Sequence, residues 1–247
     1  MKDIYEKFAY DYDEFGSIDE YLGEEKSFFE NLFKQHSVKT VLDCACGTGQ
    51  HLLMLSELGL IVSGSDYSES MLEVAKSNLA KQKKTVPLYQ CDFRYLEQKL
   101  TDTYDAIVCL TTALPHLHTD IDLITALSSM RNRLNDNGLL VLTQGTTHLT
   151  LSYPAIEVVI NRPDFSRVFI KEQDEKFQRI HVLDLFHSES RTESNQYDIV
   201  YRIILDDEYK QLLREAGFED VRIYGDYDMS AYTEKSRRLI VVARCSN

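Results

Sequence analysis

The run VLDCACGTG at residues 41–49 constrains this chain more than any other feature of its sequence. An apolar strand leads into an acid and a turn of small residues, and the segment that follows has the composition of a helix. Small residues let the backbone approach a ligand closely, and glycine adopts the positive φ of a tight turn. The pattern predicts a nucleoside-cofactor site at the carboxyl end of a buried strand, where Asp43 supplies a carboxylate.

The acid in this strand narrows the choice of ligand. A dinucleotide fingerprint has a third glycine three residues after the second, and this chain has Leu52 there. A phosphate loop needs Lys followed by Ser or Thr, and Gln50-His51 supplies neither. The carboxylate of Asp43 would repel a phosphate and attract an ammonium group. The sequence therefore favours a cationic cofactor without phosphate.

Two further apolar segments also end in acids. Residues 60–66 end at Asp66, which stands 17 residues beyond Gly49 and near the spacing at which a βαβ unit presents an acid to ribose hydroxyls. Residues 86–90 are followed by Asp92 and Phe93, a carboxylate and a ring suited to the amine and face of a purine. The carboxyl ends of parallel strands meet at one edge of a sheet, where doubly wound folds bind ligands.

The runs DCACGTG, SGSDYS, QCDF and YDAIVCLTTALPHL together resemble the class I S-adenosylmethionine-dependent methyltransferases over roughly residues 38–144. Ala45 stands where that family usually has a first glycine. The resemblance implies that S-adenosyl-L-methionine is the cofactor and S-adenosyl-L-homocysteine the product. It assigns the methionine end to Asp43, Ala45, Cys46, Gly47 and Gly49, the ribose to Asp66, the adenine to Tyr67, Met71, Asp92 and Phe93, and the sulfonium to Leu110 and Thr111.

The alternation of apolar strands with amphipathic helices predicts an α/β fold with a doubly wound, mostly parallel sheet. The resemblance extends it to seven strands in a Rossmann-like methyltransferase fold, with the last two as an antiparallel hairpin at the edge. Strands are expected at 41–43, 60–66, 86–90, 104–110, 139–144, 221–224 and 239–244. Helices are expected at 50–58, after a cap at Ser68 or Ser70, at 119–134, and before Gly217.

Residues 145–205 follow a different pattern. Residues 197–204 alternate with a period of two, and 166–171 and 179–187 are also strand-like. We expect three antiparallel strands that form a substrate cap inserted after the fifth core strand. The methyltransferase core then comprises residues 1–144 and 206–247, in which residues 1–36 form an N-terminal helical lid.

Methyl transfer from a sulfonium mainly requires alignment of an electron-rich atom with the S–CH₃ bond. A general base is needed only where the nucleophile arrives protonated. His116 is the candidate base, although a histidine that merely packs a loop is the simpler reading. Tyr12, His116, His187, Tyr201 and Arg202 are the candidate substrate residues, and Arg167 and Arg179 are further candidates for a substrate carboxylate. No metal is expected, because His181 and His187 lack a third ligand at suitable spacing.

Net charge limits the partners of the chain. Its 27 basic and 40 acidic residues give a net charge of −13, which repels the phosphate backbone of a nucleic acid. No apolar run reaches membrane-spanning length, and the first 15 residues are too acidic and aromatic for a signal peptide. Four of the five cysteines fall in or beside predicted strands, which indicates reduced thiols in the cytoplasm. We expect a small-molecule substrate and a monomer or homodimer.

Within the family, the inserted strands and the final RLIVVAR run look most like small-molecule N-methyltransferases, such as those that act on glycine, sarcosine or amino sugars. An amine is therefore the expected acceptor, while its identity and the choice among N, O and C stay open. Two alternatives are a nicotinamide-dependent oxidoreductase, disfavoured by Leu52 and Asp43, and a non-catalytic cofactor-binding or scaffold protein.

Overall fold

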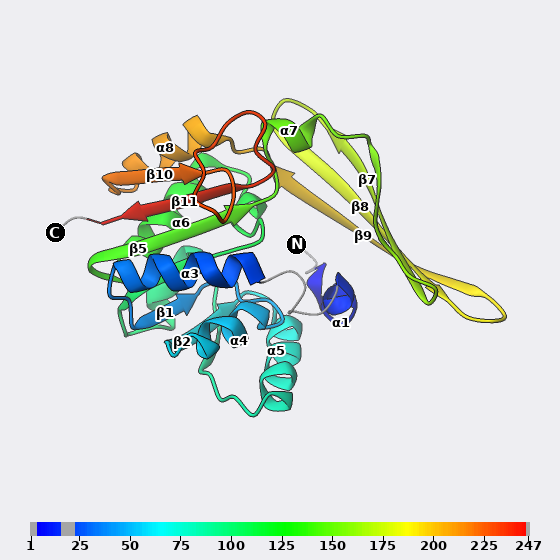
Figure 1. Ribbon diagram of the computed structural model, residues 1–247, viewed down its shortest axis with the longest axis horizontal. Coiled ribbons are helices and arrows are strands. Elements are labelled where there is room, and N and C mark those ends of the chain that lie inside the picture. Colours follow the sequence, from blue (N-terminus) through cyan, green and yellow to red (C-terminus); the bar gives the residue numbers. More distant parts are fainter. Residues whose placement is uncertain (1–3, 16–22, 246–247) are drawn as a thin grey trace.

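The computed structural model describes residues 4–15 and 23–245, which form a layered core and a separate antiparallel sheet (Figure 1). The parts of the expected N-terminal lid at residues 1–3 and 16–22 lie outside the described residues. Across the described ranges, none of the helices has both the length and the hydrophobicity that a membrane span requires.

Seven strands form the core sheet. They are β1 (Thr40–Asp43), β2 (Ile61–Asp66), β3 (Leu88–Gln90), β4 (Tyr104–Cys109), β5 (Leu134–Gln144), β10 (Asp220–Tyr224) and β11 (Leu239–Arg244). Their order is β10-β11-β5-β4-β1-β2-β3, and β11 runs antiparallel to both of its neighbours. The predicted doubly wound fold with a terminal hairpin is confirmed. The carboxyl ends of β1 to β5 therefore share one edge, at which the acids predicted to bind a cofactor meet.

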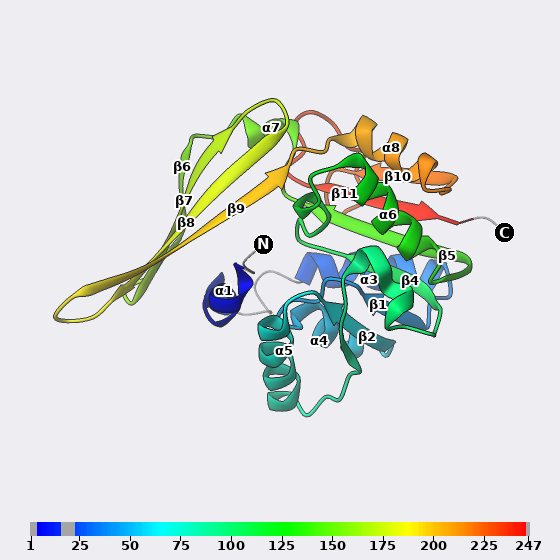
Figure 2. The ribbon, with the colours of Figure 1, turned by 180° about the vertical axis from the view of Figure 1, so that it is seen from behind.

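Helices cover both faces of this sheet (Figures 1 and 2). One face carries α3 (Gly23–Gln35), α4 (Gln50–Glu57) and α5 (Glu69–Lys81), and the other carries α6 (Asp120–Arg131) and α8 (Asp206–Glu215). Ser68 caps α5, because its side chain accepts a hydrogen bond from the backbone of Met71 over 3.4 Å. The short helices are α1 (Tyr5–Tyr12), η1 (Asp13–Phe15), η2 (Phe93–Gln98), η3 (Leu114–His116) and α7 (His148–Leu151).

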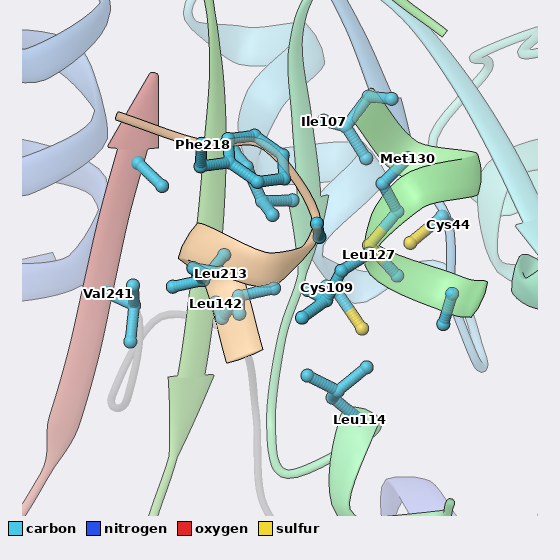
Figure 3. Packing of buried hydrophobic residues seen from close by; sticks show 14 of the residues in the cluster. Cys44, Ile107, Cys109, Leu114, Leu127, Met130, Leu142, Leu213, Phe218 and Val241 are labelled. Atoms are coloured by element: carbon cyan, nitrogen blue, oxygen red, sulfur yellow. The ribbon is translucent and has the colours of Figure 1, made fainter. Parts of the chain in front are cut away.

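Two apolar clusters fill the space between the sheet and its helices. Beneath α6 and α8, Cys44, Cys109 and Leu142 pack against Met130 and Phe218 (Figure 3). On the other face, the buried apolar side chains of α3 are Phe28, Phe29, Leu32 and Phe33, so this helix belongs to the core layer and not to a lid. All five cysteines are buried and none forms a disulfide, as expected of reduced thiols.

The boundary between α6 and β5 differs from the prediction. The helix ends at Arg131 instead of residue 134, and β5 begins at Leu134 instead of residue 139, so that residues 135–138, left between the two expected elements as a turn, belong to the strand. Asn137 does adopt a positive φ of 62°, as a turn residue would. The side chain of Asn135 explains the difference, because it donates to Asp105 over 2.8 Å and holds this segment beside β4. The turn is therefore an irregularity inside a paired strand.

The inserted residues form a second sheet, which we call the cap sheet. Its strands are β6 (Ile156–Asn161), β7 (Phe165–Gln173), β8 (Phe177–His187) and β9 (Thr192–Arg202), in that order and antiparallel throughout. The expected number of three strands was wrong. The missed strand, β6, reads Ile-Glu-Val-Val-Ile-Asn, which lacks strict alternation because apolar residues lie on both of its faces. The cap sheet projects from the core, and α1 lies between the two (Figures 1 and 2).

Candidate active site

A cavity of about 720 Å³ lies between the carboxyl edge of the core sheet and one face of the cap sheet. Six parts of the chain line it: the glycine-rich turn with the start of α4, the ends of β4 and β5, α1 with Asp13, α7 with Tyr153 after it, the cap sheet, and the loop between β10 and β11. A cavity of this size, with mixed aromatic and polar walls, is typical of a small-molecule site. The cap thus lies over the same edge that the cofactor motifs occupy.

Strand alternation decides which cap residues reach the cavity. On β8 the lining residues are Gln178, Ile180 and Val182, and on β9 they are Ile199 and Tyr201. Successive side chains of a strand point to opposite faces, so residues of the other parity lie on the outer face of the cap sheet. Tyr201 therefore reaches the cavity, as expected for a substrate residue.

His187 and Arg202, both predicted to bind substrate, do not line the cavity. His187 has the parity of the outer face and lies at the distal end of β8, where its ring contacts Ser166 and Thr192. The guanidinium of Arg202 pairs with Asp120 at 2.5 Å and with Glu208.

The other arginines considered for a substrate carboxylate do not line the cavity either. Arg167 is fully buried and forms a two-point ion pair with Asp184, at 2.6 and 2.7 Å. Arg179 has the parity of the outer face, one residue beyond Gln178. Arg237 instead lines the cavity and is exposed, and the described residues offer it no ion-pair partner.

The glycine-rich turn has the geometry that its sequence predicts. Gly47 and Gly49 have φ values of 51° and 84°, and a Cβ on Gly49 would lie 3.2 Å from that of Ala75. Asp66 clamps this turn to the next one: Oδ2 accepts from the backbone N–H of Gly47 over 2.8 Å, and Oδ1 accepts from Ser68 over 2.9 Å. Asp66 therefore joins the turn after β1 to the turn after β2 at the edge where the cofactor motifs meet.

Asp43 lies beneath the turn with only 1% of its surface exposed. Its Oδ1 accepts from the backbone N–H of Ala45 over 3.2 Å, whereas Oδ2 is buried and has no hydrogen-bond partner among the described residues. Burial raises the pKa of Asp43 to about 6. A buried carboxylate oxygen without a partner is costly, so this position fits a cationic group of a ligand.

The residues predicted to contact adenine divide into two sets. Tyr67 and Asp92 line a second hollow at the ends of β2 and β3, and Asp92 pairs there with Arg94 at 2.6 Å. In contrast, Met71 is buried, and Phe93 packs against the core cluster of α6 and α8; Leu110, which was predicted to lie under the sulfonium, is also buried. None of these three lines either hollow. Thr111 lines the main cavity with a φ of 52°.

Tyrosines of α1 and the cap meet at the candidate base. The hydroxyl of Tyr5 is hydrogen-bonded to Nε2 of His116 over 2.8 Å, and the His116 ring packs 4.8 Å from that of Tyr201. Tyr5, Tyr12 and Tyr201 line the cavity, whereas His116 lies behind them. Burial raises the pKa of all three tyrosines, so each stays a neutral hydroxyl.

Several lining residues were not predicted from the sequence. Gln50 and His51 directly follow the glycine turn, and residues 143–146 follow the fifth strand, so their positions at a ligand-binding edge were available as a signal. Tyr227, Arg237 and Arg238 come from the loop before β11, which carries no motif. Their approach to the cavity depends on tertiary structure alone.

Comparisons with known proteins agree with this geometry. A family model described as a methyltransferase domain matches residues 41–138. A glycine/sarcosine N-methyltransferase of Aphanothece halophytica is 27% identical over 89% of this chain and 81% of its own length. A putative methyltransferase of Geobacillus sp. (strain WCH70) is 28% identical over 97% of this chain and 99% of its own length. The CcbJ methyltransferase of Streptomyces caelestis has the same fold, with a TM-score of 0.84, 18% identity and coverage of 99% and 98%.

Proposed function

This chain is a class I S-adenosylmethionine-dependent methyltransferase, and we propose that it methylates the amino group of a small molecule. The family match removes the two alternatives that the sequence left open, a nicotinamide-dependent oxidoreductase and a non-catalytic scaffold. The cofactor is S-adenosyl-L-methionine. What remains to be assigned is the acceptor and the residues that act on it.

The residues at the carboxyl edge fit this cofactor. The buried Oδ2 of Asp43 suits the ammonium group at the methionine end of the cofactor. The small residues from Ala45 to Gly49 let the backbone of the turn lie close to the cofactor. Asp66 would accept from the ribose hydroxyls, and Tyr67 and Asp92 would flank the adenine. The cofactor supplies a methyl group on a sulfonium, which is already activated for displacement. The remaining task of the protein is alignment, which can supply on the order of 7–11 kcal/mol of the barrier.

One observation carries the proposal of an amine acceptor: the hydrogen bond of 2.8 Å between Tyr5 and His116 at the cavity wall. An amine enters as an ammonium ion and must lose a proton before its lone pair can attack. We assign that step to a two-residue relay. The Tyr5 oxygen takes a proton from the ammonium while its own proton passes to Nε2 of His116. The amine lone pair then forms the N–CH₃ bond, and the electrons of the breaking C–S bond stay on sulfur.

The relatives and the cavity support an acceptor of small size. The Aphanothece relative is named for glycine and sarcosine, both small amines with a carboxylate. The cavity lies between the core and the cap, and Arg237 on its wall has no ion-pair partner among the described residues. Its other cations, Lys171 and Arg238, are already paired with Glu157 and Asp226. Arg237 is therefore the residue that we assign to an acceptor carboxylate, through a bidentate contact.

The test is a methylation assay with isotope-labelled S-adenosylmethionine and a panel of small acceptors, followed by mass spectrometry of the products. The panel pairs each amino acid with its decarboxylated amine and with its hydroxy-acid analogue. We expect labelled N-methyl products, with amino acids preferred over the matching amines, and loss of that preference in Arg237→Gln. A labelled O-methyl or C-methyl product from the panel, with amines untouched, would overturn the amine assignment.

A further inference from the structure

A largely buried histidine, His51, lines the cavity beside the glycine-rich turn. His51 lies in the first turn of α4, and its Nε2 contacts Oε1 of Glu25 on α3 at 3.3 Å. Both side chains are largely withdrawn from solvent, with 13% and 6% exposed. A histidine held against a carboxylate inside a wall of the cofactor cavity places a positive charge where the ligand binds.

The carboxylate of Glu25 is itself fixed. The hydroxyl of Tyr227, from the loop between β10 and β11, donates to Oε1 of Glu25 over 2.9 Å. Burial opposes the charge of both partners, but their attraction prevails: the pKa of His51 is raised and that of Glu25 is lowered. The charged groups around His51 are Glu25 on α3, Asp43 on β1, and Arg238 beyond Tyr227. Two acids thus flank the imidazolium.

The amino-acid end of S-adenosylmethionine carries one ammonium and one carboxylate. Asp43 can pair with the ammonium group, but its negative charge would repel the neighbouring carboxylate of the cofactor. We propose that the imidazolium of His51 binds the carboxylate of the cofactor and that Glu25 is the positioning residue that keeps His51 charged and oriented. Nε2 faces Glu25, which leaves Nδ1 to donate to the carboxylate. The first-turn N–H groups of α4 add a partial positive charge at the same point.

A decarboxylated ligand tests this assignment directly. We would titrate S-adenosylmethionine and decarboxylated S-adenosylmethionine into the protein by calorimetry, without an acceptor. In His51→Gln we expect the dissociation constant of S-adenosylmethionine to rise at least tenfold and that of the decarboxylated compound to change less than twofold. Equal weakening of both ligands, or of neither, would overturn the proposal, since a purely structural histidine cannot distinguish them.

Two further variants separate positioning from stability. Glu25→Gln should lower the pKa of His51 in the cofactor-free protein, as measured by NMR of its imidazole. The same variant should weaken the binding of S-adenosylmethionine more at pH 8 than at pH 6. The control is Lys26→Gln, which breaks another ion pair between α3 and α4, with Glu57 at 2.6 Å on the surface. Lys26→Gln should leave both the pKa of His51 and the dissociation constant of S-adenosylmethionine unchanged. An unshifted His51 pKa in Glu25→Gln would contradict the role of Glu25. The inference concerns the cofactor alone, so failure to methylate any amine would leave it standing.

Discussion

The carboxylate of Asp13 accepts a hydrogen bond from the hydroxyl of Thr48 over 2.6 Å, which ties the end of the N-terminal helix to the glycine-rich cofactor turn. Its second oxygen accepts from Asn78 on α5 over 2.7 Å. Two residues earlier, Asp11 accepts from Tyr197 of the cap sheet over 2.5 Å. The last residues of the segment from α1 to Asp13 are therefore bonded both to the cofactor site and to the cap.

We expect Asp13→Ala to loosen this segment, because it removes two hydrogen bonds to a charged group, each worth about 1.5–3 kcal/mol. The release rate of bound cofactor should rise several-fold, and hydrogen exchange of residues 4–13 should accelerate. Stopped-flow and exchange mass spectrometry provide the two measurements. Lys7→Gln is the control, since Lys7 lies on the same helix and its side chain is exposed. Unchanged exchange in Asp13→Ala would refute the tether.

A second prediction concerns the buried ion pair beneath α1. Asp184→Asn leaves the guanidinium of Arg167 charged and fully buried, and breaking one partner of such a pair costs about 3–5 kcal/mol. We expect the midpoint of urea unfolding, monitored by circular dichroism, to be lower in this variant than in the wild type. Arg191→Gln at the tip of the same sheet breaks the exposed pair with Glu193 and should have little effect. Equal midpoints for the two variants would contradict the stabilising role of the buried pair.

The core could be predicted because its strands carry their own signals. Buried parallel strands are apolar on both faces, and those of this chain end in Asp43 and Asp66 at one edge. Sequence spacing alone therefore brought the cofactor residues together. Met71 and Phe93 were assigned from their neighbourhood in the motifs, but a side chain beside a site can equally pack inward, as both do here.

In the cap, strand pairing decides which side chains line the cavity, and two of the predicted substrate residues do not. His187 and Arg202 were chosen for their residue types. Which face of the sheet each occupies depends on the register of β8 and β9, in which Ile180 pairs with Ile199. That register is set by contacts distant in sequence, which a single sequence does not reveal. Arg237 was missed because its loop approaches the cavity from a distant part of the chain, whereas His51 directly follows the glycine turn and depends on Glu25 of another helix for its charge.

A third prediction follows from the buried acid at the methionine end. Folding raises the pKa of Asp43 from 3.8 to about 6, so the folded protein holds a proton that the unfolded chain releases. The stability that this proton provides is present below about pH 4 and is lost as the pH rises through 6. The penalty at pH 7.5 is up to about 3 kcal/mol.

Asp43→Asn removes this penalty and also removes the partner of the cofactor ammonium. The cofactor-free variant should therefore be more stable than the wild type at pH 7.5 and similar to it near pH 4, by urea unfolding. Its affinity for S-adenosylmethionine should fall about tenfold or more, from loss of a charge-assisted bond. A variant that is destabilised at pH 7.5, or that binds the cofactor normally, would show that Asp43 has another role.

The last prediction separates the two faces of the cap sheet. Ile180 on β8 lines the cavity and pairs with Lys171 of β7. Ile170, the residue before Lys171, lies on the outer face of the cap sheet and is 37% exposed. Ile180→Trp should fill the part of the cavity that we assign to the acceptor. The cofactor motifs lie on the opposite wall, so the dissociation constant of S-adenosylmethionine should change less than twofold while kcat/KM for the acceptor falls at least tenfold. Ile170→Trp adds the same bulk to the outer face and should change neither quantity. If Ile180→Trp methylates its acceptor as the wild type does, the cap does not bind the substrate, and residues 145–205 have a different function.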